Sequence, residues 1–274
     1  MYSKEDIKKQ LSAMKLPKGS TVLVHSALSK VGEVEGRGDG LIDALKEYVC
    51  ENGGLLCIPT HTWANLGRSD VITLDLAEPS TCIGTLPDLA AKRTDACRSV
   101  HPTHSMAVFG DGAKEFASGE ELFDSPADPR GCYGKIYERG GYILLVGVGH
   151  NRNTYLHCVE EMLGVENRLD KNIRRVTVRC ADGIIEERFT RGHFTEGVRD
   201  ISTSFPKYEP AFRYHGCITD GYVGNAPTQL CSARKMAAVM KLIYQKSGGA
   251  ELLISQDPIP KEYYEGELCE DVNG

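Results

Sequence analysis

The sequence predicts an α/β protein. Short apolar runs that enter polar loops alternate along the chain with segments whose apolar residues recur at helical spacing. The clearest apolar run, residues 143–148, follows a Gly-Gly break and suits a strand that is buried on both faces. The 274 residues could form one large domain or two smaller ones. Because no repeat, low-complexity stretch or linker is visible, we expect a single domain over residues 1–274, with a loosely packed tail after about residue 255.

The first elements are a helix, a strand and a second helix. Residues 4–14 carry Ile7, Leu11 and Met14 at helical spacing, and the Pro-Lys-Gly step that begins at residue 17 ends this helix. The run TVLVH, residues 21–25, predicts a strand, and residues 41–50 predict the next helix. The intervening glycines do not form a phosphate loop, because no Gly-Lys-Ser/Thr step follows them. Backbone N–H groups at the helix entrance could receive an anion, but a flexible loop is the simpler interpretation.

The middle of the chain places polar clusters beside predicted strands. Residues 53–59 predict a strand that ends at Thr60, His61, Thr62 and Trp63, a position where pockets in open α/β sheets usually form. Residues 83–93 predict a helix. Residues 106–109 resemble a strand, and a dense polar cluster precedes them: Arg98, Ser99, His101, Thr103, His104 and Ser105.

The second half predicts a loop, a strand, a helix and a hairpin. Residues 123–135 are rich in Pro, Gly and Asp and predict an irregular loop that leads toward the strand at 143–148. Residues from Thr154 onward suit a helix. The Asp182-Gly183 step lies between two alternating runs and is a strong hairpin signal. Residues 207–233 show no clear pattern, and residues 233–246 predict a helix with one apolar face.

Composition narrows the class of protein. The net charge of −6 argues against a nucleic-acid partner, because such partners usually require a basic excess. The ten cysteines include no C-x-x-C pair and resemble reduced core cysteines. The N-terminal segment lacks a signal-peptide hydrophobic region, and no apolar run approaches membrane-spanning length, so we expect no membrane partner and a reducing cytoplasm. The oligomeric state stays open, a homodimer included.

The strongest candidate for chemistry is the pair His157 and Glu160. Three residues apart on a helix, the two side chains lie on one face, so the carboxylate can contact the imidazole or line the same cleft. This pairing suits general base catalysis near neutral pH. Spacing alone allows an equally good alternative, in which His157 is a buried histidine and Glu160 is a solvated charge.

Three kinds of chemistry are candidates for this sequence. His101 and His104 form an H-x-x-H pattern that could hold a metal in a hydrolase, but Pro102 makes a regular helical pair unfavourable. Cys158 is a poor nucleophile candidate, because adjacent helical residues do not face each other. Transfer of an activated acyl group to an amine needs only a base, oxyanion donors such as Thr154 and a loop that holds the acyl carrier.

Several blocks in order give the chain a family resemblance. They are TVLVHSALSKVG, PSTCIGTLPDLAAKR, RSVHPTHSMAVFG, and GKIYERGGYILLVGV followed by a T-x-L-H-x-x-E step. Over about residues 5–165, and more loosely to about 245, the chain resembles the aminoglycoside 3-N-acetyltransferase family. The resemblance implies a single α/β/α sandwich around a central, mixed sheet. It also implies acetyl-CoA as co-substrate and acetylation of the 3-amino group of 2-deoxystreptamine aminoglycosides, an antibiotic-resistance activity.

The resemblance assigns roles to particular residues. His157 is implied as the general base, and Glu160 as the residue that orients it or binds the cationic substrate. Two segments match the blocks that lie against the acyl carrier. Their residues are His25, Ser26, Ala27, Leu28 and Ser29 in the first, and Arg98, Ser99, His101 and Ser105 in the second.

The acceptor side is less well defined by the sequence. We expect Thr62, Asp124 and Glu161 to contact the amine acceptor, because acidic groups steer a polycation, and we expect no metal ligand. The chain departs from the family pattern at residues 131–135 and in the short segment 63–79. The acceptor could therefore be a different amine from an aminoglycoside.

Overall fold

The core of the molecule is one seven-stranded mixed sheet. The structure is a computed structural model that describes residues 1–68 and 70–268. The strand order is β4-β5-β2-β1-β6-β10-β9. β1 pairs in parallel with β2 and with β6, whereas β5 runs antiparallel to β2 and β10 antiparallel to β6. The strands are β1 Thr21–Ser26, β2 Leu55–Pro59, β4 Cys97–Arg98, β5 Met106–Phe109, β6 Tyr142–Val146, β9 Ile218–Val223 and β10 Ala226–Ser232.

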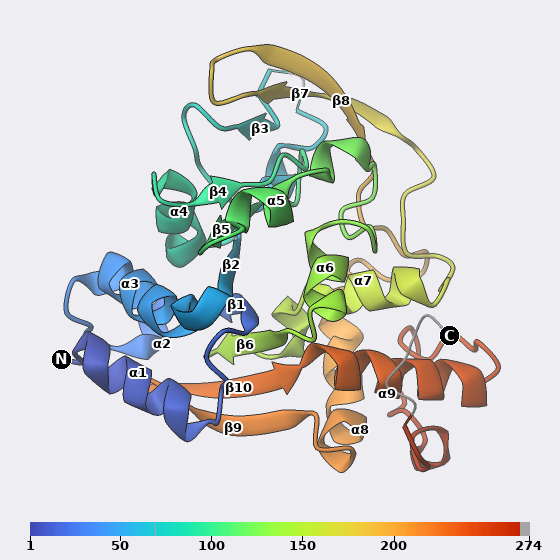
Figure 1. Cartoon of the computed structure of the whole chain (residues 1–274). Helices are drawn as coiled ribbons and strands as arrows, with labels where there is room; N and C mark the ends of the chain where they lie inside the picture. Colours follow the sequence, from blue (N-terminus) through green and yellow to red (C-terminus); the bar gives the residue numbers. More distant parts are fainter. Residues whose placement is uncertain (69, 269–274) are drawn as a thin grey trace.

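Helices cover both faces of this sheet, which confirms the predicted α/β/α sandwich (Figure 1). One apolar layer contains residues of α1, α3 and α4, and the other contains residues of α5 to α9. Strand β1 shows the alternation, since Val22 and Val24 belong to the first layer and Leu23 to the second. The helices are α1 Lys4–Ala13, α2 Leu28–Val31, α3 Arg37–Val49, α4 Thr85–Lys92, α5 Ala113–Ala117, α6 Cys132–Glu138, α7 Tyr155–Met162, α8 Glu209–Tyr214 and α9 Ala233–Lys246.

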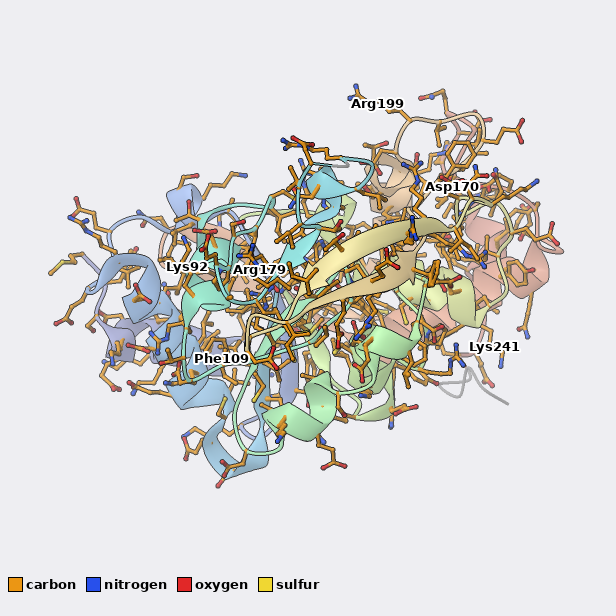
Figure 2. The ribbon with its side chains drawn as sticks, turned by 90° about the horizontal axis from the view of Figure 1, so that it is seen from above. Lys92, Phe109, Asp170, Arg179, Arg199 and Lys241 are labelled. Atoms are coloured by element: carbon orange, nitrogen blue, oxygen red, sulfur yellow. The ribbon has the colours of Figure 1, made fainter. Side chains whose placement is uncertain are left out.

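A smaller sheet of three strands lies apart from the main one. It has the order β3-β7-β8, and Figure 2 shows its hairpin crossing the molecule when viewed from above. The strands are β3 Leu74–Asp75, β7 Arg174–Arg179 and β8 Ile185–Thr190. The Asp182-Gly183 turn joins β7 to β8 as predicted, with Gly183 at φ +85°. Beyond β8 the chain returns toward α7, and a β-bridge joins Leu169 to His193.

Two segments expected as loops are partly helical. Helix α3 begins at Arg37, inside the glycine-containing loop, because its glycines permit close packing: a Cβ on Gly40 would lie 1.8 Å from the Glu35 carbonyl oxygen. Helix α6 begins at Cys132, inside the segment expected to be irregular. There a Cβ on Gly134 would lie 1.6 Å from the Pro129 carbonyl oxygen. In both places glycine marks close backbone approach rather than flexibility.

The C-terminal segment packs more closely than expected. Ile259 and Tyr264 are buried in the layer that contains α9, and His215 Nε2 lies 2.5 Å from the Tyr264 carbonyl oxygen. The last six residues of the expected loose tail, 269–274, lie outside the described residues. The nine cysteines of the described residues are all free thiols. Across those same residues, we find no helix of the length and apolarity that a membrane crossing requires.

Candidate active site

Six of the eight histidines gather at one edge of the main sheet. Three parallel strands, β1, β2 and β6, end at this edge, and the antiparallel β5 begins there. The carboxyl edge of parallel strands is where open α/β sheets form their sites. We call these residues the histidine cluster: His25, His61, His101, His104, His157 and His193.

His157 lies in the first turns of α7 and is almost fully buried. Its ring stacks on His193 with centroids 3.8 Å apart and an interplanar angle of 16°, and Phe205 packs against it at 4.7 Å. Only 7% of the residue is exposed. Burial lowers the pKa of His157 to about 3, an effect that Asp200 opposes and Arg168 reinforces. The imidazole is therefore neutral at pH 7 and has the free lone pair that a base needs.

Behind His157 lies a chain of ionisable groups that runs from the buried Glu160 and Arg168 to Glu251 at the surface. Glu160 Oε2 is 3.7 Å from His157 Nδ1, and Glu160 Oε1 accepts a hydrogen bond from Arg168 Nε at 2.7 Å. Arg168 in turn forms a two-pronged ion pair with Glu251. Burial raises the pKa of Glu160 to about 7, and Arg168 opposes that shift. Since Glu160 is 0% exposed, the solvated alternative for this residue is wrong.

His157 Nδ1 and Glu160 Oε2 are both buried without a hydrogen-bond partner. Their separation of 3.7 Å is slightly too long for a hydrogen bond. Catalytic hydrogen bonds are often long in unliganded enzymes and tighten when substrate binds. The two unpartnered atoms face each other across this short gap.

The remaining rings of the histidine cluster contact one another. His104 lies 5.1 Å from His193 and 4.2 Å from His61, measured between ring centroids. His61 Nε2 is 2.8 Å from the Tyr133 hydroxyl, and His104 Nδ1 is 3.0 Å from Thr103 Oγ1. Sequence reasoning missed His193 as a site residue, because neither its spacing nor its neighbours in sequence point to His157.

The first segment expected to lie against the acyl carrier, residues 25–29, is at the end of β1. Ala27 comes immediately before the short helix α2, and its backbone N–H donates to the Val146 carbonyl at the end of β6. His25 faces the histidine cluster, with Nε2 buried and unpartnered, and burial lowers its pKa to about 3. Ser26 and Leu28 are half-buried and Ser29 is exposed, so a ligand can reach this loop.

The second segment expected to lie against the carrier makes several internal hydrogen bonds. Ser105 Oγ accepts from Arg98 Nη2 at 2.7 Å and donates to the Thr60 carbonyl, and Ser99 Oγ accepts from Met106 N. Ser99 and Ser105 are 0% exposed. These bonds hold β4, β5 and the end of β2 together. The two serines are therefore engaged within the protein, whereas Arg98 is half-buried and its Nε has no hydrogen-bond partner. Binding of the carrier by Arg98, Ser99 and Ser105 stays a prediction.

The four-residue step from His101 to His104 is a turn rather than a metal site. His101 Nδ1 accepts hydrogen bonds from the backbone N–H groups of Thr103 and His104, at 3.2 and 3.0 Å. That nitrogen is therefore occupied. Within residues 1–68 and 70–268, no group of three or more His, Cys, Asp or Glu side chains is arranged to hold a metal ion. The metal-hydrolase alternative has no donor set in that part of the chain.

The three residues expected to contact the acceptor differ in their burial and in the bonds that their side chains already make. Thr62 is 3% exposed and its hydroxyl donates to the Pro102 carbonyl. Asp124 forms an ion pair with Arg191 at 2.9 Å, and Glu161 Oε1 accepts from Ser125 Oγ at 2.5 Å. Burial raises the pKa of Glu161 to about 7, with further contributions from neighbouring carboxylates such as Asp124. The geometry thus brings Glu161 and Asp124 together near α7, whereas the Thr62 hydroxyl is already bonded to Pro102. Contact of these three residues with the acceptor stays a prediction.

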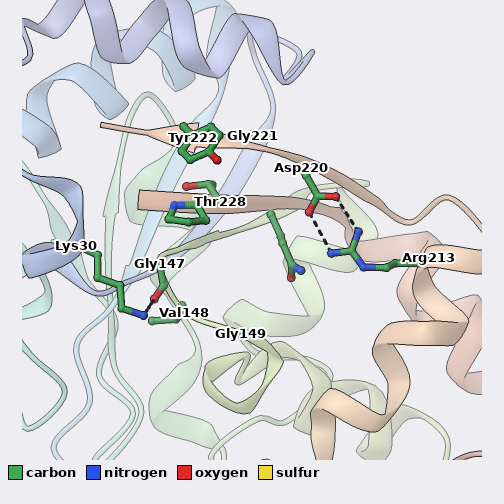
Figure 3. Close-up of a pocket in the computed structure, with 11 residues that line it drawn as sticks. Lys30, Gly147, Val148, Gly149, Arg213, Asp220, Gly221, Tyr222 and Thr228 are labelled. Atoms are coloured by element: carbon green, nitrogen blue, oxygen red, sulfur yellow. Dashed lines mark hydrogen bonds and ion pairs between the residues drawn. The ribbon is translucent and has the colours of Figure 1, made fainter. Parts of the chain in front are cut away.

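A pocket of about 540 Å³ lies beside the carrier loop (Figure 3). Lys30, at the end of α2, donates to the Gly147 carbonyl at 2.7 Å along its wall. Arg213, on the opposite side, is paired with Asp220. None of the histidine-cluster residues lines this pocket. It is therefore a candidate for holding a ligand's distal part and not for the chemistry itself.

Comparison with known proteins decides the family. The family model described as aminoglycoside 3-N-acetyltransferase matches residues 23–245. The chain belongs to that family. Its similarity to aminoglycoside N(3)-acetyltransferase VII of Streptomyces paromomycinus is 28% identity over 249 residues, which covers 82% of this chain and 85% of the relative. With aminoglycoside N(3)-acetyltransferase III of Serratia marcescens it is 26% identical over 266 residues, or 87% and 95% of the two chains.

Solved members of the aminoglycoside 3-N-acetyltransferase family share this fold. A histidine-to-alanine mutant of AAC(3)-IVa in complex with a gentamicin superposes with a TM-score of 0.74 at 26% identity, covering 90% of each chain. AAC-IIIb, solved as a binary complex with CoASH, has a TM-score of 0.77 at 22% identity, covering 90% of this chain and 97% of its own. The expected family and enzyme class are confirmed by the family model and the named relatives.

Proposed function

We propose that the protein transfers an acetyl group from acetyl-CoA to the 3-amino group of a 2-deoxystreptamine aminoglycoside, with His157 as general base. The observation that carries the proposal is the buried, neutral imidazole of His157 with Glu160 and Arg168 behind it, at the carboxyl edge of the parallel strands. Two sequence relatives are named as aminoglycoside N(3)-acetyltransferases. A protein with a similar fold, AAC(3)-IVa, was solved with a gentamicin after a histidine was replaced.

The reaction proceeds by direct attack. The acceptor amine forms a bond to the acetyl carbon while His157 takes its proton. The carbonyl electron pair moves to oxygen, then returns and breaks the bond to sulfur. Coenzyme A leaves as a thiolate, which receives a proton from the imidazolium. Glu160 stabilises that imidazolium in the interval. No covalent enzyme intermediate is needed, in keeping with the burial of Cys158, which raises the pKa of its thiol.

Donor and acceptor reach His157 from different sides. The loop of Ser26 to Ser29, which is half-buried as far as Leu28 and exposed at Ser29, supports the donor. The distal part of the donor extends to Lys30 and the pocket of Figure 3, where a lysine suits an anionic phosphate. The acceptor lies beside Glu161 and Asp124, near the α7 end of the site. Because Arg191 already neutralises Asp124, Glu161 is the carboxylate better placed to meet a cationic ring.

The test is an assay of thiol release from acetyl-CoA with a panel of acceptors. We expect turnover with gentamicin, sisomicin or apramycin, unchanged by a chelator, and a product whose acetyl group is on the 3-amino nitrogen by NMR. Turnover with simple amines alone would show that the acceptor is a different amine. Two results would contradict the proposal. One is thiol release that occurs without an acceptor and depends on added metal, and the other is no turnover with any amine.

A further inference from the structure

Both ring nitrogens of His193 are buried and have no hydrogen-bond partner, although the residue as a whole is half-buried. Buried polar groups are nearly always satisfied, and leaving one unpaired costs about 1–3 kcal/mol. Its backbone is held in place by the β-bridge to Leu169 and by Phe194 N, which donates to the Arg168 carbonyl. A side chain kept in this position without an internal partner is one that awaits a ligand.

The ring of His193 is neutral in its surroundings. Burial lowers its pKa well below the usual value, and His157 and His101 add to that effect while Asp200 opposes it. The rings packed on it are His157 on one face and His104 at its edge. A neutral imidazole carries one N–H donor, and it can polarise a carbonyl without giving up a proton.

Because the two imidazoles are stacked, an edge of the His157 ring lies beside an edge of the His193 ring. The rings of His157 and His193 are 3.8 Å apart and inclined by only 16°. In a tetrahedral intermediate, the attacking nitrogen and the oxyanion are bound to one carbon and lie roughly 2.3 Å apart. Two nearly parallel imidazoles at this separation can contact both atoms at once, one ring at the nitrogen and the other at the oxygen.

We propose that His193 is a second catalytic residue, which donates an N–H hydrogen bond to the thioester oxygen while His157 deprotonates the amine. The assignment rests on the proposed function. As the amine nitrogen bonds to carbon, the carbonyl electron pair moves onto oxygen and is stabilised by His193. Expulsion of the thiolate restores the carbonyl. The proton travels from the amine to His157 and then to the thiolate, and His193 keeps its own proton throughout.

The proposal predicts what happens when the N–H group of His193 is removed and an aromatic ring is kept in its place. We expect His193→Phe to lower kcat by about 10²- to 10³-fold, the usual effect of losing one oxyanion donor. The KM for acetyl-CoA should change little. His193→Gln restores an N–H donor, so its kcat should be at least about tenfold higher than that of His193→Phe. Since His157 remains the base, the acid limb of the kcat/KM profile should stay where it is.

His150→Phe is the matched control. His150 is also a buried histidine with an unpartnered nitrogen, but it packs on Phe212 outside the histidine cluster, so its variant should keep parental kcat. Near-ultraviolet circular dichroism checks folding, and if His193→Phe does not fold, His193→Ala and His193→Gln make the same comparison. Parental kcat in the donor-free variant, or a glutamine variant no better than it, would overturn the assignment. Absence of acetylation by the parental enzyme would instead reject the proposed function.

Discussion

Replacement of His157 by alanine is expected to lower kcat by about 10²- to 10⁴-fold, the usual contribution of a general base. The affinity for CoA should persist, because residues 26–29, which we propose support the donor, belong to the end of β1 and to α2 and not to α7. The measurement is steady-state thiol release, together with calorimetric titration of CoA. Loss of turnover without loss of CoA binding separates a role in chemistry from a role in assembling the site.

Cys158→Ala provides the control at the neighbouring position. Cys158 is 0% exposed and belongs to the apolar layer under α7, so we expect its variant to lose some stability while keeping kcat close to the parental value. If the cysteine variant lost turnover and the histidine variant kept it, the catalytic roles would have to be reversed. Equal losses in both would point to damage to α7 as a whole.

Acidification is expected to unfold the protein well above pH 4. Burial lowers the pKa of seven histidines, namely His25, His61, His101, His104, His150, His157 and His193. The unfolded chain takes up protons on these residues below pH 6.5 and the folded chain does not. Their contribution to stability is therefore present above pH 6.5 and is lost as the pH falls.

Three buried carboxyls act in the opposite direction. Burial raises the pKa values of Glu120, Glu160 and Glu161 to about 7, so between pH 4.5 and 7 these groups bind protons in the folded state. The two effects nearly cancel at pH 7. Towards pH 5 the seven histidines outnumber the three carboxyls, which leaves an excess of about four protons bound by the unfolded chain. Each such proton changes the free energy of unfolding by about 1.4 kcal/mol per pH unit. Typical domain stabilities of about 5–15 kcal/mol would be consumed within a few pH units.

Urea unfolding at pH 7.0, 6.0 and 5.0 measures this dependence. We expect the midpoint to fall steadily over that range, and we expect His150→Phe to show a shallower fall, because it removes one of the seven protons. A midpoint that stays constant from pH 7 to 5 would mean that the histidines are not buried as neutral groups.

The sequence predicted the main elements because their signals are local. The runs at 106–109 and 233–246 match β5 and α9 as observed, and the Asp182-Gly183 turn joins β7 to β8. Errors occurred where glycines pack closely, as at Gly40 and Gly134, since single residues do not distinguish flexible backbone from tightly packed backbone.

The site was only partly predictable for a physical reason. His157 and Glu160 share one helix, so spacing revealed their proximity. His193, Arg168 and Glu251 come from separate segments, and only the folded chain brings them to α7. The block around Ser99 and Ser105 was assigned to the carrier by family resemblance. The sequence did not show that the Ser105 hydroxyl bonds to the end of β2 and that the Ser99 hydroxyl bonds to β5, because residue type alone does not indicate burial.

A ternary crystal structure with an acceptor and a non-transferable acetyl-CoA analogue tests the central claim most directly. The distance to measure joins a His157 ring nitrogen to the 3-amino nitrogen of the acceptor. We predict hydrogen-bond contact, at about 2.6–3.2 Å or through one water, with that amine facing the thioester carbon. An amine poised at the thioester but held by another side chain, with the His157 ring out of reach, would contradict the account.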